Sequence, residues 1–162
     1  MTTPEFTGGA LDNSIKPLRS LFAWGMLAYA AVELFFTFLD WITPSTGSSF
    51  TARSYSADFS DLFTIVLPIV AVLIATHISP VLAASRLIAT VALLEYAVVL
   101  VFGALTFLIG LGYTFTGVNT ARETIGAFSH IVFGLLGLAL AALAGYGVLR
   151  VFTALGGRLP TR

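Results

Sequence analysis

Four ionisable side chains stand inside long apolar stretches of the sequence, and these residue types are the ones best suited to chemistry there. They are Glu33, His77, Glu95 and His130. A carboxylate or an imidazole in an apolar medium is costly unless the group is neutral, hydrated or hydrogen-bonded. Two interpretations stay open. Each group fixes how helices pack, or the groups serve a proton or ion path or a small-ligand pocket.

The composition identifies the medium around these residues. Of the 162 residues, 57% are hydrophobic and 10% are charged, and the mean hydropathy is +0.96. Soluble domains carry about 25% charged residues, so this chain has too few polar side chains to cover a water-facing surface. We therefore expect a multi-pass protein of the cell (plasma) membrane, with the lipid bilayer as its first partner.

Charge, cysteine content and motifs exclude several other classes. The formal net charge is zero, which gives no reason to expect a nucleic acid partner. Cysteine is absent, which excludes disulfides, thiolate metal sites and cysteine nucleophiles. The sequence has no phosphate-binding loop, dinucleotide fingerprint, HExxH or GxSxG motif. We expect neither an enzyme nor a bound cofactor.

The apolar segments predict an all-α fold, a bundle of four transmembrane helices. A helix crosses the bilayer with about 20 apolar residues. The predicted spans cover about residues 20–40, 61–78, 87–111 and 124–148, within a transmembrane domain over residues 17–152. The remaining segments are a flexible tail, one external loop and a second tail, over residues 1–16, 41–60 and 153–162.

Prolines mark the second span. Pro68 lies inside it and predicts a kink. Ser79 and Pro80 predict a break, because the residue before a proline avoids helical geometry. Ser79 is also a candidate cap for a following helix.

A cleaved signal peptide is an alternative for the first span. Ala28, Tyr29 and Ala30 have the small-x-small form of a cleavage site. The apolar run continues to Leu39, which is too long for a segment that ends in cleavage.

The distribution of Lys and Arg predicts the orientation. The two ends and the turn over residues 79–86 carry Lys16, Arg19, Arg86, Arg150, Arg158 and Arg162. The other two loops carry Arg53 and Arg122. Cytoplasmic loops are rich in Lys and Arg, so both termini are expected in the cytoplasm.

Helix rise places the ionisable residues in two layers. Glu33 lies about 12 Å and His130 about 9 Å below the outer interface, at about 1.5 Å per residue, so these two are expected to meet. Glu95 and His77 are expected in an inner layer, roughly 10–15 Å from Glu33 along the membrane normal. A b-type haem is disfavoured, because the two histidines fall at different depths.

Two helical faces complete the pattern. Tyr29, Glu33, Thr37 and Asp40 form one polar stripe on the first span, which should turn away from lipid. Gly137, Ala141 and Gly145 form a ridge of small residues on the fourth span, which lets backbones approach closely. That ridge packs inside the bundle or forms a dimer seam.

The middle third of the chain resembles a known family. The stretch from Ala75 to Leu87 contains His77, Pro80 and Arg86, and Glu95-Tyr96-Ala97 follows. This pattern resembles small actinobacterial tetraspan proteins, in which a His-x-x-Pro turn leads to an Arg and then to a Glu-Tyr-Ala helix. The topology is also similar to that of MARVEL-type tetraspans. The resemblance implies the four-helix topology and no activity.

Two function hypotheses follow. The first is a non-enzymatic scaffold or accessory subunit that packs against itself or another membrane protein, favoured by the missing catalytic motifs, the small-residue ridge and the short loops. The alternative is a small transporter or channel that uses Glu33 and Glu95 as protonatable sites. The transporter hypothesis requires a water-accessible cavity that reaches one of these carboxyl groups.

Overall fold

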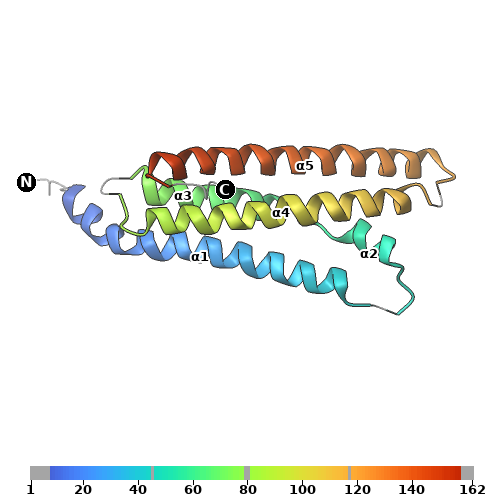
Figure 1. Cartoon of the computed structure of the whole chain (residues 1–162), viewed down its shortest axis with the longest axis horizontal. Helices are drawn as coiled ribbons and strands as arrows, with labels where there is room; N and C mark the ends of the chain where they lie inside the picture. The colour runs from blue at the N-terminus through green and yellow to red at the C-terminus, as the bar shows by residue number, and fades with distance from the viewer. Residues whose placement is uncertain (1–7, 45, 79–80, 117, 158–162) are drawn as a thin grey trace, which may run out of the picture.

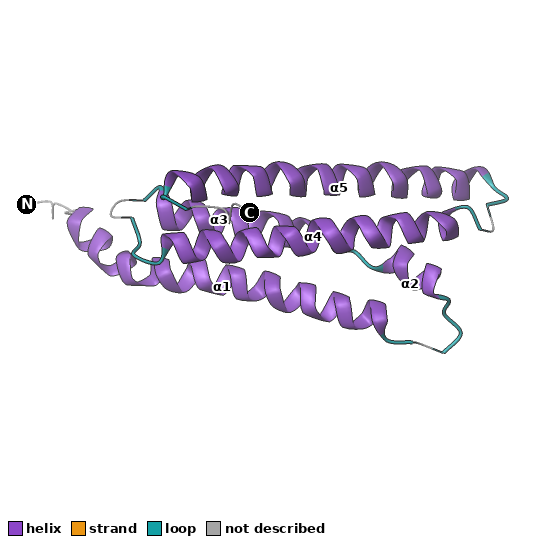
Figure 2. Ribbon diagram, in the orientation of Figure 1, coloured by secondary structure: helices purple, strands orange, loops and turns teal. Residues whose placement is uncertain are grey.

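The fold is built from helices alone in the part of the chain that the structure describes. The computed structural model describes residues 8–44, 46–78, 81–116 and 118–157. Within these ranges it contains no strand and the following helices (Figures 1 and 2): α1 (Gly8–Ile42), α2 (Phe50–Ser56), α3 (Leu62–Thr76), α4 (Ser85–Thr114) and α5 (Ala121–Ala154). The predicted all-α class is confirmed. The predicted break at Ser79 and Pro80 lies outside the described residues.

Three of these helices are long and apolar enough to cross a membrane. They are α1 over Leu18–Ile42, α4 and α5. Only 22–33% of the most apolar window of each helix is buried inside the protein, so most of that apolar surface faces outward. A surface of this kind requires lipid as its solvent. The expected membrane protein with transmembrane helices is supported at this level.

Helix α1 is longer than expected. It begins at Gly8, within the segment predicted as a flexible tail over residues 1–16. The weak helix formers near the start of the chain suggested a coil. Once the apolar part of a helix is held by packing, however, each further residue adds a hydrogen bond at little cost. Helix α5 likewise continues to Ala154, into the predicted second tail.

Helix α3 is shorter than the predicted second span. It has 15 residues, and its N-cap Asp61 accepts a hydrogen bond from Phe63 N at 2.8 Å. A helix of this length is about 22 Å long, whereas the hydrocarbon core of a bilayer is about 30 Å thick. Pro68 is buried inside α3. By itself, α3 does not reach from one side of such a core to the other.

The segment predicted as one external loop over residues 41–60 contains helix α2. Helix α2 lies beside α4, at the end of the bundle where α1 and α4 end and α5 begins (Figure 1). Trp41 Nε1 donates a buried hydrogen bond to Ser54 Oγ at 2.8 Å. Both Ser54 and Phe59 are at most 2% exposed. The polar residues of this segment gave no sign of a helix, because its packing partners lie in α1 and α4.

Together, α2 and α3 run along α4. A Cβ atom on Gly110 would contact the backbone of Tyr55, while one on Gly103 would lie 3.7 Å from Phe59 Cβ. The hydroxyl group of Tyr96, near the other end of α4, donates to the carbonyl oxygen of Ile65 in α3. Residues 57–61, which join the two helices, therefore lie beside the central part of α4.

The core of the bundle lies between α1, α3, α4 and α5. Its largest fully buried side chains include Tyr96, Leu27, Ile88, Val72 and Val148. Tyr96 also lies against Gly145 of α5, where a Cβ atom would be 3.2 Å from Tyr96 Cβ. Because its side chain contacts both α3 and α5, Tyr96 fixes how these helices pack on α4.

Candidate functional site at the break between α2 and α3

Polar side chains stabilise the non-helical backbone of residues 57–61. Asp58 Oδ1 accepts a hydrogen bond from Ser60 N at 3.2 Å. Thr64 Oγ1 lies within hydrogen-bond distance of two carbonyl oxygens, 3.1 Å from that of Phe59 and 2.8 Å from that of Asp61. Buried backbone groups need such partners wherever a helix is interrupted. The polar sequence of this segment is thus what allows the chain to leave one helix and begin another.

Helix α2 is held in place by its own polar contacts. Ser49 caps its first turn by accepting from Ala52 N at 3.1 Å. Arg53 donates from Nε to the carbonyl oxygen of Trp41 at 3.1 Å and from Nη1 to that of Ser48 at 3.2 Å. Together with the bond from Trp41 to Ser54, these contacts join α2 to the end of α1.

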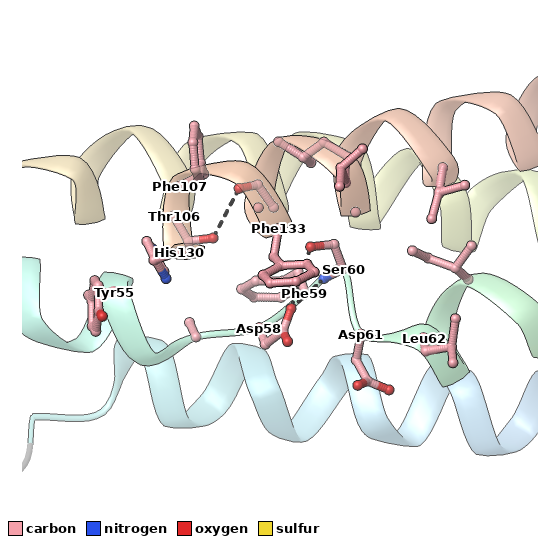
Figure 3. A pocket seen from close by; sticks show the side chains of 18 of the residues that line it. Tyr55, Asp58, Phe59, Ser60, Asp61, Leu62, Thr106, Phe107, His130 and Phe133 are labelled. Atoms are coloured by element: carbon pink, nitrogen blue, oxygen red, sulfur yellow. Dashed lines mark hydrogen bonds between the residues drawn. The ribbon is translucent and has the colours of Figure 1, made fainter. Parts of the chain in front are cut away.

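A cavity of about 550 Å³ lies between this break and helices α4 and α5 (Figure 3). Its wall is formed by residues of α2, the break, α3, α4 and α5. The polar groups on its wall include Ser60, Thr106 and His130, and its aromatic side chains are Tyr55, Phe59, Phe107 and Phe133. The ring of His130 lies against that of Tyr55, with centroids 4.1 Å apart. We refer to this space as the α5-side cavity.

A second cavity, of about 380 Å³, lies on the α1 side of the same break. Its wall carries four carboxyl groups and one guanidinium group, from Glu33, Asp40, Asp58, Asp61 and Arg53. We refer to this space as the α1-side cavity. Asp58 and Asp61 line both cavities, so the two spaces adjoin at the acidic residues of the break.

Glu33 and Asp40 are the carboxyl groups of the α1-side cavity that come from α1, and Glu33 lies deeper in that helix. Its Oε2 atom is buried and has no hydrogen-bond partner in the described part of the chain. Asp61 and Asp58 both repel its negative charge. Glu33 lies about 13 Å from the end of α1 at Ile42, by helix rise. A partly buried carboxyl group that shares a cavity with other acids is a candidate site for binding a proton or a cation.

The predicted polar stripe lies largely together. Glu33, Thr37 and Asp40 all line the α1-side cavity. Tyr29, one turn earlier, does not line it. This side chain is 54% exposed, and its ring lies 6.4 Å from that of Phe63. The stripe therefore faces a cavity at one end and the outer surface of the bundle at the other.

The predicted meeting of Glu33 and His130 needs correction. Glu33 lines one cavity and His130 the other. Asp58 lines both cavities, and its charge acts on both groups. Estimates of depth placed the two residues in one layer, but depth does not tell on which side of an intervening segment a side chain lies. The connecting residue was missed because Asp58 was assigned to an external loop.

The predicted inner pair is not formed. His77 is exposed at the end of α3, and its Nδ1 atom lies 2.9 Å from Thr76 Oγ1. Glu95 is only 6% exposed, and neither of its carboxyl oxygens has a hydrogen-bond partner in the described residues. Neither cavity is lined by Glu95. Its carboxyl group is thus enclosed in the core, away from His77.

The ridge of small residues packs within the chain. A Cβ atom on Gly137 would lie 2.9 Å from Ser60 Oγ, and Gly145 lies against Tyr96. Ala141, between them, is fully buried. These contacts are between α5 and residues of the break and α4, so the ridge is not left free to form a dimer seam.

No metal centre is evident in the described ranges, where no group of three His, Cys, Asp or Glu residues is arranged to hold a metal ion. Comparison with protein-family models, with curated proteins and with solved structures gives no match to this chain. The class that fold and composition indicate is a helical membrane protein. Its site is an interrupted helical segment with a cavity on either side.

Proposed function

We propose that the chain crosses the membrane four times and that α2, residues 57–61 and α3 together make the second crossing. Gly137, which lies against Ser60, stands at the midpoint of α5, so the break falls near the middle of a spanning helix. Non-helical backbone at membrane depth is tolerated where it is buried in protein or lines a water-filled cavity. The cavities beside residues 57–61 support this arrangement.

We further propose that the protein is a small, non-enzymatic transporter or channel that takes up protons at Glu33. The observation that carries this proposal is that Glu33 lines a cavity shared with Asp58 and Asp61 at the interrupted segment. Discontinuous helices recur in secondary transporters, where substrate and ion sites lie beside the break near the bilayer midplane. With the orientation predicted from Lys and Arg, this cavity faces the outside of the cell.

Glu95 is the proposed second protonatable site, towards the cytoplasmic side. It precedes Gly103, which lies beside Phe59 of the break, by about 12 Å of helix. Since neither cavity reaches Glu95, a proton passes from Glu33 to Glu95 only if the segment around residues 57–61 rearranges. The polar hinge between two short helices is the element suited to such a change.

The scaffold hypothesis takes second place. It was favoured in part by the ridge of Gly137, Ala141 and Gly145, which packs against other parts of the same chain. A role as an accessory subunit that binds itself or another membrane protein stays a prediction. Purification in mild detergent tests it, and recovery of a monomer without partners would count against it.

Proton flux tests the transporter proposal. The full-length protein is placed in liposomes that enclose a pH-sensitive dye, and a potassium diffusion potential drives protons inward. We expect the wild type to acidify the interior faster than empty liposomes do, and Glu33→Gln to behave like empty liposomes. Glu123→Gln is the matched control, because it also removes one carboxylate while a Gln preserves the capping box with Thr120. Wild-type flux equal to that of empty liposomes would refute the proposal.

A further inference from the structure

The α5-side cavity has the size and lining of a small-molecule site. Its volume is about 550 Å³, and pockets that bind small molecules span about 300–1,000 Å³. Apolar and aromatic side chains dominate its wall, with a few polar groups directed into it (Figure 3). A lining of this kind is typical of ligands that are largely apolar and carry one polar feature.

The surroundings of the cavity indicate that its ligand comes from the lipid phase. Several lining residues are also among the most exposed apolar side chains of the protein. Phe133 is 71%, Leu136 52% and Leu140 50% exposed on α5, and Leu62 is 63% exposed at the start of α3. These exposed lining residues, on α5 and at the start of α3, form the rim of the cavity. Where bilayer surrounds such a rim, a molecule dissolved in lipid can enter from the side.

The charged residues that line the cavity favour a ligand with a positive charge. The ionisable residues that line the cavity are Asp58, Asp61, Tyr55 and His130, and the lining contains neither Lys nor Arg. The guanidinium group of Arg53 lines the other cavity and donates to the carbonyl oxygens of Trp41 and Ser48. An anionic headgroup would therefore meet carboxylates with no cation on the wall to receive it. A cation would meet those carboxylates and the faces of several aromatic rings, both of which attract it.

We propose that the α5-side cavity binds a hydrophobic organic cation, with Asp58 as its counter-ion. This inference rests on the proposed transport function, for which it names the class of substrate. Phospholipids of the bilayer are a poorer fit, because each carries a phosphate group that would lie beside Asp58. Since Asp58 and Asp61 also line the α1-side cavity, a cation bound beside them reduces the negative potential at Glu33. Substrate binding and proton binding at Glu33 therefore oppose each other, as exchange of one for the other requires.

Equilibrium binding of radiolabelled tetraphenylphosphonium to the purified full-length protein tests the proposal without any flux measurement. We expect saturable binding that the neutral analogue triphenylphosphine oxide does not displace. Asp58→Asn should weaken binding about tenfold or more, because the counter-ion is lost. The substitution keeps an Oδ1 acceptor for Ser60 N, so the turn should persist. Glu123→Gln, which removes a carboxylate far from both cavities, should bind like the wild type.

A second variant provides a control in case Asp58→Asn misfolds. Asp58→Glu retains the charge and should bind the cation within a few-fold of the wild type if Asp58 acts as a counter-ion. The proposal is overturned if the folded wild type shows no saturable binding, if the neutral analogue competes equally, or if Asp58→Asn binds unchanged. It is also overturned if native mass spectrometry finds a phospholipid that the cation does not displace.

The two proposals fail in distinguishable ways. Proton flux that depends on Glu33, without cation binding, would support the transport proposal and refute the proposed cation site. Cation binding would support the proposed site, while the absence of proton flux both with and without the cation would refute the transport proposal. The Glu33→Gln variant separates them further, because it should lose flux and still bind the cation.

Discussion

Gly110 of α4 is the position where a single methyl group should push α2 out of the bundle. A Cβ atom there would lie 2.9 Å from Tyr55 Cα, 3.0 Å from Tyr55 N and 3.2 Å from the carbonyl carbon of Ser54. All three are backbone atoms, so no side chain can turn aside to make room. Ordinary carbon contacts lie at about 3.5–4.0 Å, so α2 would have to retreat by roughly 0.5–1 Å in Gly110→Ala.

The magnitude follows from two opposing effects. Overpacking of a well-packed contact typically costs about 1–3 kcal/mol, and the retreat of α2 also strains the bond from Trp41 to Ser54. Replacing a helical glycine by alanine gains about 0.5–1 kcal/mol. Gly112→Ala is the matched control, because Gly112 lies in the same helix and a Cβ atom there meets nothing within 4 Å.

The assay is the free energy of unfolding of each variant in mixed micelles, from reversible titration with a denaturing detergent. Gly112→Ala should be slightly more stable than the wild type. Gly110→Ala should be less stable than Gly112→Ala by about 1–3 kcal/mol. If both substitutions stabilise the protein equally, α2 does not lie against α4, and the description of an interrupted helical segment fails.

Three further substitutions test other contacts. Ser54→Ala leaves the indole N–H of Trp41 buried without its partner. The free energy of unfolding should therefore fall by about 1–3 kcal/mol, and a loss of less than about 0.5 kcal/mol would contradict the hydrogen bond. Glu95→Leu removes two buried oxygens that lack partners in the described residues. The free energy of unfolding should be unchanged or about 1 kcal/mol higher, and a large decrease would contradict the absence of a polar contact at Glu95. Thr120→Ala removes the cap of α5 and should cost about 1 kcal/mol, with no change counting against the capping box.

Much of the fold could be predicted from the sequence because long apolar runs leave a chain few alternatives in lipid. The helices around Glu33, Glu95 and His130 lie where the apolar pattern placed them. The polar spacing on the first span also predicted a common face, and Glu33, Thr37 and Asp40 do line one cavity. Such patterns are local, and they depend only on helical periodicity.

The interrupted segment could not be predicted in the same way, since long-range contacts hold it. Ser54 accepts its hydrogen bond from Trp41. The backbone of Tyr55 can approach α4 closely because residue 110 is a glycine. Nothing in the polar sequence around Asp58 distinguishes an external loop from a segment inside the bundle. For this reason the sequence did not predict that Asp58 lines the cavities of both Glu33 and His130.

Helix rotation limited the prediction of the ionisable pairs. Depth along the membrane normal follows from the number of residues to the end of a span, but the direction of a side chain depends on how the helices pack. Glu95 points into the core and His77 is exposed, so a similar depth did not bring them together.

Residues 57–61 should lie beside the middle of α5, where Ser60 contacts Gly137, instead of outside the membrane domain. The chain has no cysteine, so a single pair can be introduced as Ser60→Cys and Gly137→Cys. Ser60 Cβ lies 3.2 Å from the Cβ position on Gly137, close to the separation of about 3.5–4.5 Å in disulfides. Thr46→Cys with Gly137→Cys is the control pair, because Thr46 is exposed in the loop before α2.

Oxidation of the paired variants in isolated membranes, followed by mass analysis of the linked peptides, is the most direct measurement. We expect a rapid disulfide between positions 60 and 137 and none between positions 46 and 137. Failure of the first pair to cross-link in folded protein, or equal cross-linking of both pairs, would show that residues 57–61 do not lie beside the middle of α5.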